Sequence, residues 1–281
     1  MTGDCHVQFG ERLAGKFRWP TCLDITIDYR HFSPTTDLTQ SISRSALDKL
    51  SDHLKSELSQ YTNNTVLPLL EENFKSKLPG KTFKLELSED GEQLRVYYPS
   101  LFEQESKYLQ NNVFVEFGGR NSTEPNEICV IKTMLSDVIK DLALPTANVK
   151  VLSPLRTFWE KATLIHVECH RGRLSNSPER LSRHWYDLAK LSNSWVGKNA
   201  LLKQELLGDV VLHKKAFFRA GYAHYDHCLE KQFKLVPNSD EIKSLSADFD
   251  EMQNAGMFSE NPPSFDELIE SIRKLELEIN K

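Results

Sequence analysis

The sequence predicts an α+β protein, with a small mixed sheet and flanking helices followed by an all-helical C-terminal part. Three features carry this prediction. Stretches of alternating apolar and polar residues, typical of half-buried strands, all lie in the first 154 residues. Asp90-Gly91 separates two of these stretches, as in a β-hairpin. After Thr157 nearly every stretch repeats its apolar residues at helical spacing. We therefore expect two domains, residues 1–154 and residues 155–281.

The first predicted elements are a strand and two helices. Residues 23–32 alternate in the manner of a strand. A helix capped by Ser41 or Ser43 is expected to follow. Its apolar face consists of Leu47, Leu50, Leu54 and Leu58. A second helix is predicted over residues 66–78, because a Pro-Gly pair interrupts the chain directly after it.

The remaining strands precede the remaining helices. Residues 81–90 and 92–100 form the predicted hairpin, and further strands are expected over residues 111–120 and 148–154. Helices are predicted over residues 157–171, 178–192, 195–207, 209–219, 239–254 and 264–280. Strands and helices are thus separated along the chain, which is the basis for the two expected domains.

Charge is distributed unevenly. The 281 residues carry a net charge of −5, which does not indicate a general nucleic-acid coat protein. Residues 150–234 nevertheless hold 15 Lys and Arg against 8 Asp and Glu, whereas residues 235–281 hold 4 against 11. A local positive segment suits a bound polyanion such as a nucleotide or RNA. The alternative is that basic helices pair with acidic helices nearby.

The sequence indicates a cytoplasmic protein without membrane contact. No stretch approaches 18 uninterrupted apolar residues, as a transmembrane helix would require. The first twenty residues have charged side chains and no apolar core, so no signal peptide is expected. The five cysteines show no CxxC pair, which is typical of reduced thiols.

Several enzyme classes lack their signature motif. The chain has no GxxxxGK[ST] phosphate-binding loop and no GxGxxG after a first strand, which leaves P-loop ATPases and Rossmann dehydrogenases unsupported. It also has no GxSxG elbow and no HExxH pair. The α/β-hydrolases and zincin metalloproteases are therefore unsupported as well.

Carboxylates on neighbouring strands are the first candidate for chemistry, because they can bind a divalent metal for phosphoryl transfer. Glu116 shares one face of its strand with Phe114. Asp24 and Asp28 are four residues apart, about 13 Å on a regular strand, so they cannot both bind one ion closely. The spacing alone favours a solvated face of a half-buried sheet.

Histidines of residues 156–173 are the second candidate. His166 and His170 are four residues apart on a predicted helix and could share a metal. The sequence HYDHC at residues 224–228 could complete a zinc site, but it lacks the ligand spacing of known zinc modules. We therefore favour the interpretation that these histidines are hydrogen-bonded packing residues.

Two further charged sites leave alternatives open. Lys161 could bind a phosphate, or it could pair with a carboxylate from another element, which the residues alone favour. Arg183 and Asp187 are four residues apart on one helix face, as in an ordinary surface ion pair.

Four strings together resemble the AbiEii/AbiGii nucleotidyltransferase toxin family: VFVEFGGRNSTEP (113–125), VLSPLRTFWEKATLIHVECHR (151–171), PERLSRHWYDLAKL (178–191) and HKKAFF (213–218). LDITIDYRHF (23–32) resembles the stretch that ends and follows the family's paired acidic motif. The resemblance covers residues 23–281, and RTFWEK followed by RHWYDL is its most specific part. It implies a nucleotidyltransferase-like domain over residues 1–154 and a helical domain over residues 155–281.

The resemblance also implies an activity and its partners. The family's reaction transfers a nucleoside monophosphate from an NTP, with Mg²⁺, to an acceptor such as tRNA or another RNA. Such toxins belong to toxin–antitoxin and abortive-infection systems, and their usual partner is a winged-helix antitoxin.

Residue roles follow from the resemblance position by position. Asp24 resembles the second aspartate of the paired motif, and Glu116 is the expected further carboxylate, so these two would bind the metal. Lys161 resembles the phosphate-contacting lysine of the family's EK helix. The late basic–acidic motif corresponds to Arg183, His184 and Asp187. The implied catalytic residues are Asp24, Glu116, Lys161 and Asp187, and the implied nucleotide-binding residues are Arg120, Lys161, Arg183 and His184.

The chain departs from the family pattern at its start. Residues 1–22 contain no Gly-Gly-Thr/Ser segment to bind the triphosphate, and Cys22 stands where the first paired aspartate is expected. We hypothesise that this N-terminus is truncated or altered. The alternative function is therefore a catalytically silent family member that acts as a binding protein. A third interpretation is an RNA-binding module that uses the surface of residues 150–234.

Overall fold

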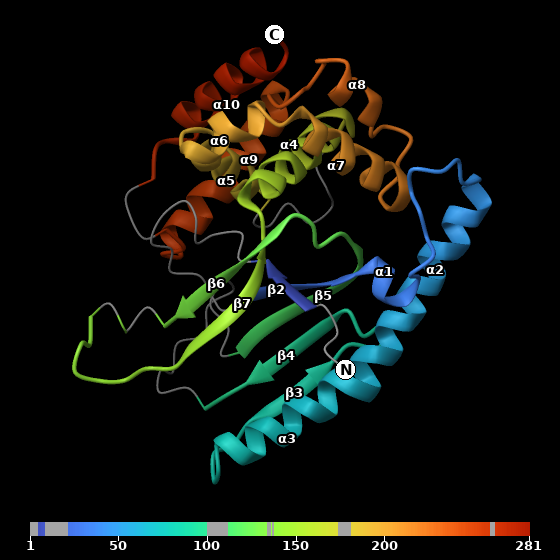
Figure 1. The fold of residues 1–281 in the computed structure, drawn as a ribbon. Coiled ribbons are helices and arrows are strands. Elements are labelled where there is room, and N and C mark those ends of the chain that lie inside the picture. Colours follow the sequence, from blue (N-terminus) through green and yellow to red (C-terminus); the bar gives the residue numbers. More distant parts are fainter. Residues whose placement is uncertain are drawn as a thin grey trace.

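The computed structural model describes residues 5–8, 22–99, 112–133, 136, 138–173, 181–258 and 262–281. Figure 1 shows a sheet below and a group of helices above it, with one long helical segment along the side of the sheet. Mixed α+β architecture is therefore confirmed, whereas the domain boundary at residues 154/155 stays a prediction.

The described residues form one seven-stranded mixed sheet in the spatial order β3-β4-β5-β2-β1-β7-β6. Strand β2 runs parallel to β5, β1 runs parallel to β7, and the other neighbours are antiparallel. The strands are β1 (Cys5–Gln8), β2 (Cys22–Asp28), β3 (Lys84–Leu87), β4 (Gln93–Tyr97), β5 (Asn112–Asn121), β6 (Asn126–Lys132) and β7 (Thr146–Leu152).

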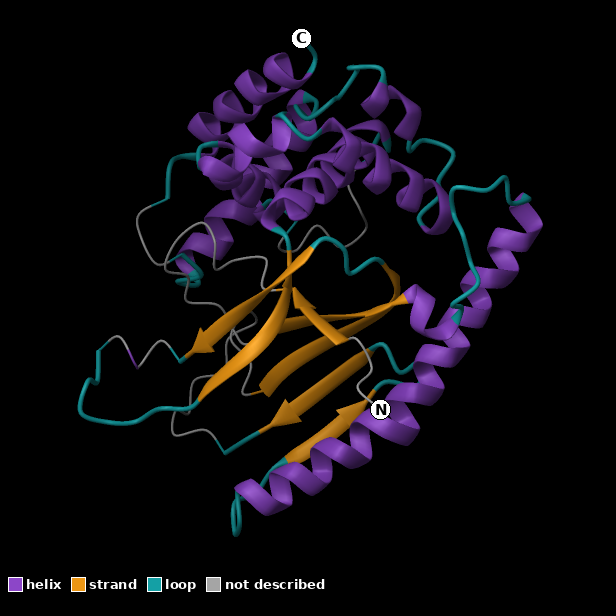
Figure 2. Cartoon of the chain, viewed as in Figure 1, coloured by secondary structure: helices purple, strands orange, loops and turns teal. Residues whose placement is uncertain are grey.

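One face of the sheet is covered by the first helices, which Figure 2 shows in purple beside the strands. These are α1 (Tyr29–Phe32), α2 (Arg44–Tyr61), the π-helical turn η1 (Thr62–Val66) and α3 (Leu67–Lys77). Ser43 caps α2, because its side chain accepts a hydrogen bond from the Ala46 N–H. Leu58 of α2 is buried against Ile27 of β2.

The C-terminal helices pack on one another around their own apolar core. They are α4 (Pro154–His170), α5 (Arg183–Ser192), α6 (Trp195–Leu201), α7 (Gln204–Phe217), α8 (Tyr225–Leu229), α9 (Ser239–Asn254) and α10 (Phe265–Ile279). Trp159 and Trp185 are fully buried at its centre. A separate small cluster, Tyr29, Leu54, Ala216 and Phe217, joins the sheet side to α7.

The structure corrects the predicted boundaries in two places. The strand expected over residues 23–32 ends at Asp28, because the Asp28 carboxylate accepts the Arg30 N–H and starts helix α1. The helices expected over residues 195–207 and 209–219 are separated at Lys203, whose backbone leaves the helical region (φ −113°, ψ 67°), and not at Gly208, which lies inside α7. This break lets Leu206 and Leu207 pack into the same core as Val196.

The sequence pattern predicted the hairpin correctly but missed two strands and a short helix. Gly91 adopts φ +71° in the turn between β3 and β4, a conformation that favours glycine, as Asp90-Gly91 predicts. Strands β1 and β6 and the short helix α8 were not expected. In β6 the apolar Ile128 and Val130 are exposed, so the strand lacks the buried stripe that would reveal it.

Candidate active site

Two of the expected catalytic carboxylates lie side by side on the sheet. Asp24 of β2 and Glu116 of β5 are register partners on parallel strands, so their backbones are about 4.8 Å apart and their side chains point to the same face. The alternate residues Ile25 and Phe117 pack in the apolar cluster with α2. Asp24 and Glu116 therefore occupy the face opposite that helix, where Asp24 is exposed and Glu116 half-buried.

Asp28 has a structural role in the same strand. Its carboxylate accepts hydrogen bonds from the Arg30 side chain (2.7 and 2.8 Å) and from the N–H and hydroxyl of Thr123 (3.1 and 2.7 Å). Burial raises the pKa of Asp28, but these hydrogen bonds outweigh it and hold the pKa well below its ordinary value. Asp28 thus fixes the end of β2 to the turn after β5, a role that its spacing from Asp24 did not predict.

The other two expected catalytic residues form an ion pair in the helical part. The Lys161 ammonium of α4 donates to the Asp187 carboxylate of α5 at 2.6 Å. The spacing of Arg183 and Asp187 predicted an ion pair at the surface. The Asp187 side chain is instead only 7% exposed. Lys161 therefore pairs with a carboxylate from another element, which is the alternative that the residues alone favour.

Positive charge surrounds His184 beside this pair. Its Nδ1 is buried without a hydrogen-bond partner among the described residues. Burial, followed by the positive charges of Lys161, Arg183 and Lys214, lowers the pKa of His184 well below its ordinary value. The three cations thus lie near this imidazole, and the Lys161 charge is compensated by the Asp187 carboxylate.

Lys214 of α7 also lies near His184, and no role was predicted for it from the sequence. Burial lowers its pKa, while Glu160 raises it and Arg156 lowers it further. The ammonium lies 4.6 Å from the Phe218 ring centroid, a cation–π contact. The HKKAFF string that contains Lys214 was the signal in the sequence, although that string alone does not say which of its two lysines points inward.

Arg120 lies apart from the carboxylates. It is four residues beyond Glu116 on β5, about 13 Å along a regular strand. Its guanidinium donates to the Ser51 hydroxyl of α2 at 3.4 Å and lies 5.4 Å from the Phe218 ring centroid of α7. These contacts place its side chain between α2 and α7, and its role in nucleotide binding stays a prediction.

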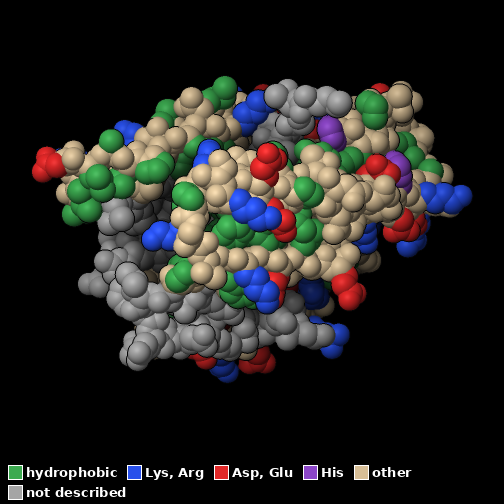
Figure 3. Space-filling view, turned by 90° about the horizontal axis from the view of Figure 1, so that it is seen from below, with side chains coloured by type: hydrophobic (Ala, Val, Ile, Leu, Met, Phe, Trp, Pro, Cys, Tyr) green, Lys and Arg blue, Asp and Glu red, His purple; other side chains and the backbone are tan. Residues whose placement is uncertain are grey.

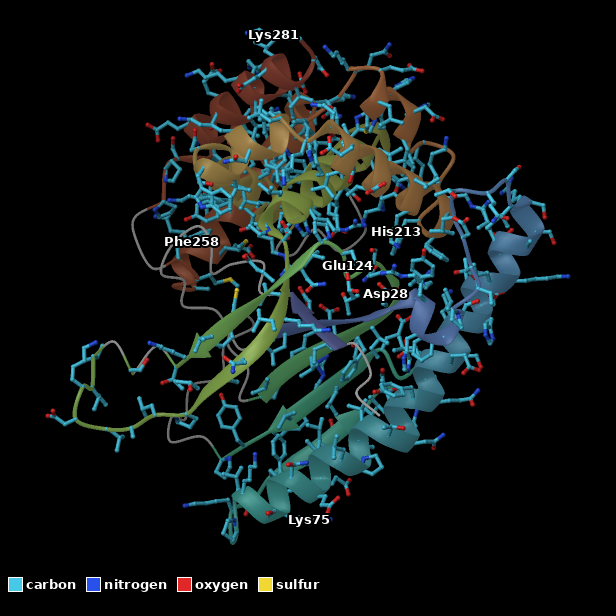
Figure 4. The ribbon with its side chains drawn as sticks, viewed as in Figure 1. Asp28, Lys75, Glu124, His213, Phe258 and Lys281 are labelled. Carbon is cyan, nitrogen blue, oxygen red and sulfur yellow. The ribbon has the colours of Figure 1, made fainter. Side chains whose placement is uncertain are left out.

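A cavity of about 750 Å³ opens where the sheet meets the helices. Its lining includes Arg30, Glu124, Arg156 and His213, and none of the expected catalytic residues. Figure 4 shows Asp28, Glu124 and His213 at this junction. The Arg156 guanidinium donates to the Glu124 carbonyl at 2.8 Å, and His213 Nε2 lies 2.8 Å from the Arg120 carbonyl. These contacts tie α4 and α7 to the end of β5.

The structure thus brings the expected residues together as two pairs, Asp24–Glu116 on the sheet and Lys161–Asp187 between helices. Together the two pairs supply the residue types that a phosphoryl-transfer site needs: carboxylates for a metal, from Asp24 and Glu116, and a cation for phosphate, from Lys161. A comparison with family models supplies the deciding observation: the model described as "Nucleotidyl transferase AbiEii toxin, Type IV TA system" matches residues 23–271. The chain belongs to the AbiEii family.

AbiEii membership gives the chain a coarse function, that of a nucleotidyl transferase toxin of a type IV toxin–antitoxin system. An antitoxin partner follows from that system. A search of curated proteins and a search of solved structures each found no significant match. Within the described residues, no helix is both long enough and apolar enough to cross a membrane.

Proposed function

We propose that this AbiEii protein transfers a nucleoside monophosphate from an NTP to an RNA acceptor such as tRNA. An acceptor hydroxyl oxygen attacks the α-phosphorus and loses its proton to solvent, the bond from that phosphorus to the bridging oxygen of the β-phosphate breaks, and pyrophosphate leaves. The register pairing of Asp24 with Glu116 carries the proposal, because it puts two carboxylates on the same face of the sheet, opposite α2.

The two carboxylates fit a divalent cation. Mg²⁺ prefers oxygen ligands and is commonly held by one or two carboxylates together with substrate phosphates. Asp24 and Glu116 would hold it, and the bound ion would neutralise charge on the phosphates. Cys22 replaces the expected third carboxylate two residues before Asp24, so this site depends on fewer protein ligands than the family pattern provides.

Lys161 would contact the triphosphate, and Asp187 would orient its ammonium. The 2.6 Å ion pair limits the rotamers of Lys161 before substrate binds. Arg183 and His184 would contribute to phosphate binding, as would Lys214, because their charges and hydrogen-bonding groups gather beside this pair. Arg120 would contact the nucleotide farther along β5.

The remaining assignments belong to the same proposal. A winged-helix antitoxin would bind and control this toxin in a system that acts through abortive infection. The cytoplasm supplies both NTP and tRNA, so we place the activity there. We also retain residues 1–154 and 155–281 as the two functional domains.

A second candidate function is a catalytically silent binding protein. The observation that favours it is Cys22, because a strand with one carboxylate in the paired motif holds metal less strongly. The third candidate, an RNA-binding module that uses the surface of residues 150–234, rests on the positive charge of that segment. The face seen in Figure 3 is on the sheet side of the molecule, and there basic and acidic side chains are interspersed.

Label transfer tests the proposal. The purified chain is incubated with each α-labelled NTP, Mg²⁺ and total tRNA, and RNA and protein are analysed for label. We expect label with the unmodified chain and its loss in Glu116→Gln, which removes a charge but little volume. Glu86→Gln is the matched control, since Glu86 is an exposed carboxylate of β3 in the same sheet. Absence of label from a folded, NTP-binding sample would instead support the silent member.

A further inference from the structure

A cluster of histidines joins α4 to α8 and contains none of the residues assigned to nucleotidyl transfer. His166 and His170 lie one turn apart on α4, so both point to the same side of that helix. His227 reaches them from α8. One ligand nitrogen from each of the three rings lies within 4.8 Å of the other two.

The three rings differ in how their nitrogens are used. The Lys234 N–H donates to His166 Nδ1 at 3.0 Å, and His166 Nε2 lies 3.2 Å from the His224 carbonyl. His166 is therefore held by backbone on both sides, as a packing residue. In contrast, His170 Nε2 is buried and has no hydrogen-bond partner among the described residues. A buried nitrogen without a partner is costly, and a bound ion would satisfy it.

We propose that His170 and His227, completed by His166, bind a divalent transition-metal ion of the Zn²⁺ class. Imidazole nitrogen is a preferred ligand of Zn²⁺ and Co²⁺ but not of Mg²⁺, so this site is chemically distinct from the carboxylate pair. Zn–N bonds of about 2.0–2.1 Å require nitrogens about 3.4 Å apart in a tetrahedral site. The ligand nitrogens must therefore approach one another by up to about 1.4 Å, which side-chain rotations provide.

His166 sets the order of importance among the ligands. Because the Lys234 N–H donates to Nδ1, the ring proton resides on Nε2, where it faces the His224 carbonyl. Only the unprotonated nitrogen of a neutral imidazole binds a metal, so coordination by His166 uses Nδ1 and costs the hydrogen bond from the Lys234 N–H. His170 and His227 would therefore contribute most of the metal affinity. A water molecule would be the fourth ligand of the ion.

Neighbouring side chains support His227 and exclude two other candidate ligands. The His224 ring stacks on the His227 ring, with centroids 5.0 Å apart and planes 12° apart, which fixes the orientation of His227. Asp226 instead pairs with Lys215 at 2.7 Å, and Cys228 is buried in the apolar core. The sequence HYDHC thus contributes one ligand rather than a complete zinc module.

Metal titration of the full-length chain, free of any histidine tag and stripped with EDTA, tests this proposal. Zn²⁺ binding is measured by calorimetry, and Co²⁺ binding by the visible absorption of its imidazole complex. We expect one ion per chain and a raised Tm. His170→Gln and His227→Gln should each weaken Zn²⁺ binding at least about tenfold, because even loss of a supporting second-shell group costs about 10–100-fold.

His53→Gln is the matched control, since His53 is a half-exposed histidine on α2. It should leave Zn²⁺ affinity unchanged. Equal affinity in the unmodified chain and both cluster variants would overturn the proposal, as would the absence of stoichiometric binding. Co²⁺-induced broadening of histidine ring resonances in the unmodified chain provides a readout that needs no variant to fold.

Discussion

Lys161 and Asp187 are 26 positions apart in sequence and meet in a 2.6 Å ion pair between α4 and α5. The two side chains are only 15% and 7% exposed. An ion pair this deeply buried constrains both groups, because each charge needs the other once water is excluded. The pair therefore links the packing of the helical part to the charge that we assign to phosphate binding.

Breaking this pair on one side should destabilise the protein. Lys161→Met leaves the Asp187 carboxylate buried without its counter-ion, so we expect a loss of about 3–5 kcal/mol in the free energy of unfolding. The double variant Lys161→Met/Asp187→Leu replaces both charges with apolar groups and should recover most of this loss. Urea unfolding of the single and double variants measures the difference. Equal stability of the two would contradict a strongly coupled pair.

Restoring the expected acidic residue at position 22 should raise activity. Position 22 lies two residues before Asp24 on β2, the place where the family resemblance expects the first paired aspartate. We expect Cys22→Asp to accelerate label transfer at least about tenfold, equivalent to about 1.4 kcal/mol in the barrier. Cys22→Ser, which adds no charge, is the control. No acceleration in a folded Cys22→Asp sample would argue against a metal site shared with Asp24.

His213 should make stability depend on pH. Its Nδ1 is buried without a partner among the described residues, and burial lowers its pKa to about 3. In the unfolded chain His213 binds a proton near pH 6.5, whereas in the folded chain it stays neutral at that pH. The contribution of His213 to the free energy of unfolding is therefore fully present above about pH 6.5. It is lost as the pH falls from there toward 3.

We expect His213→Gln to reduce the slope of stability against pH by about 1.4 kcal/mol per unit below pH 6. Glutamine stays neutral and can still donate to the Arg120 carbonyl. Urea unfolding between pH 7.5 and 4.5 measures the slope, with His53→Gln as a control. An unchanged slope in His213→Gln would show that His213 is not the responsible group.

Asp28 should stabilise the fold by holding the end of β2 to Thr123. Asp28→Ala removes the acceptor for the buried N–H and hydroxyl of Thr123, and hydrogen bonds to a charged group contribute about 1.5–3 kcal/mol each. We expect a loss of about 3 kcal/mol, measured by thermal or urea unfolding. The control is Asp37→Ala. The exposed Asp37 carboxylate accepts a hydrogen bond from the Thr39 N–H, and its loss should lower the free energy of unfolding by less than about 1 kcal/mol. Similar losses for both variants would refute this role of Asp28.

Local patterns were sufficient for much of the fold. The alternation in residues 111–120 predicted β5 to within a residue at each end, and residues 239–254 form the predicted helix α9. The placement of Glu116 on the face opposite Val115 and Phe117 follows from the same alternation. Asp24 and Glu116 were expected to act together only from the family resemblance, because no sequence pattern specifies that β2 pairs with β5.

The patterns failed where tertiary contacts decide the outcome. The break at Lys203 lies inside a stretch whose local propensity is helical, and burial of Leu206 and Leu207 favours the turn. In β6, at the edge of the sheet, Ile128 and Val130 are exposed although they are apolar. The order of apolar and polar residues in this strand therefore did not indicate which side is buried. The histidines likewise form a cluster only because α8 returns to α4.

The sequence by itself determined the mixed α+β class, the hairpin and the nucleotidyl transferase toxin family, since these depend on residue order and local spacing. Only the tertiary structure decided which side chains meet: Asp24 with Glu116, Lys161 with Asp187, and His170 with His227. Each of these contacts joins segments far apart in the chain. Burial and strand pairing, which no local pattern encodes, bring them together.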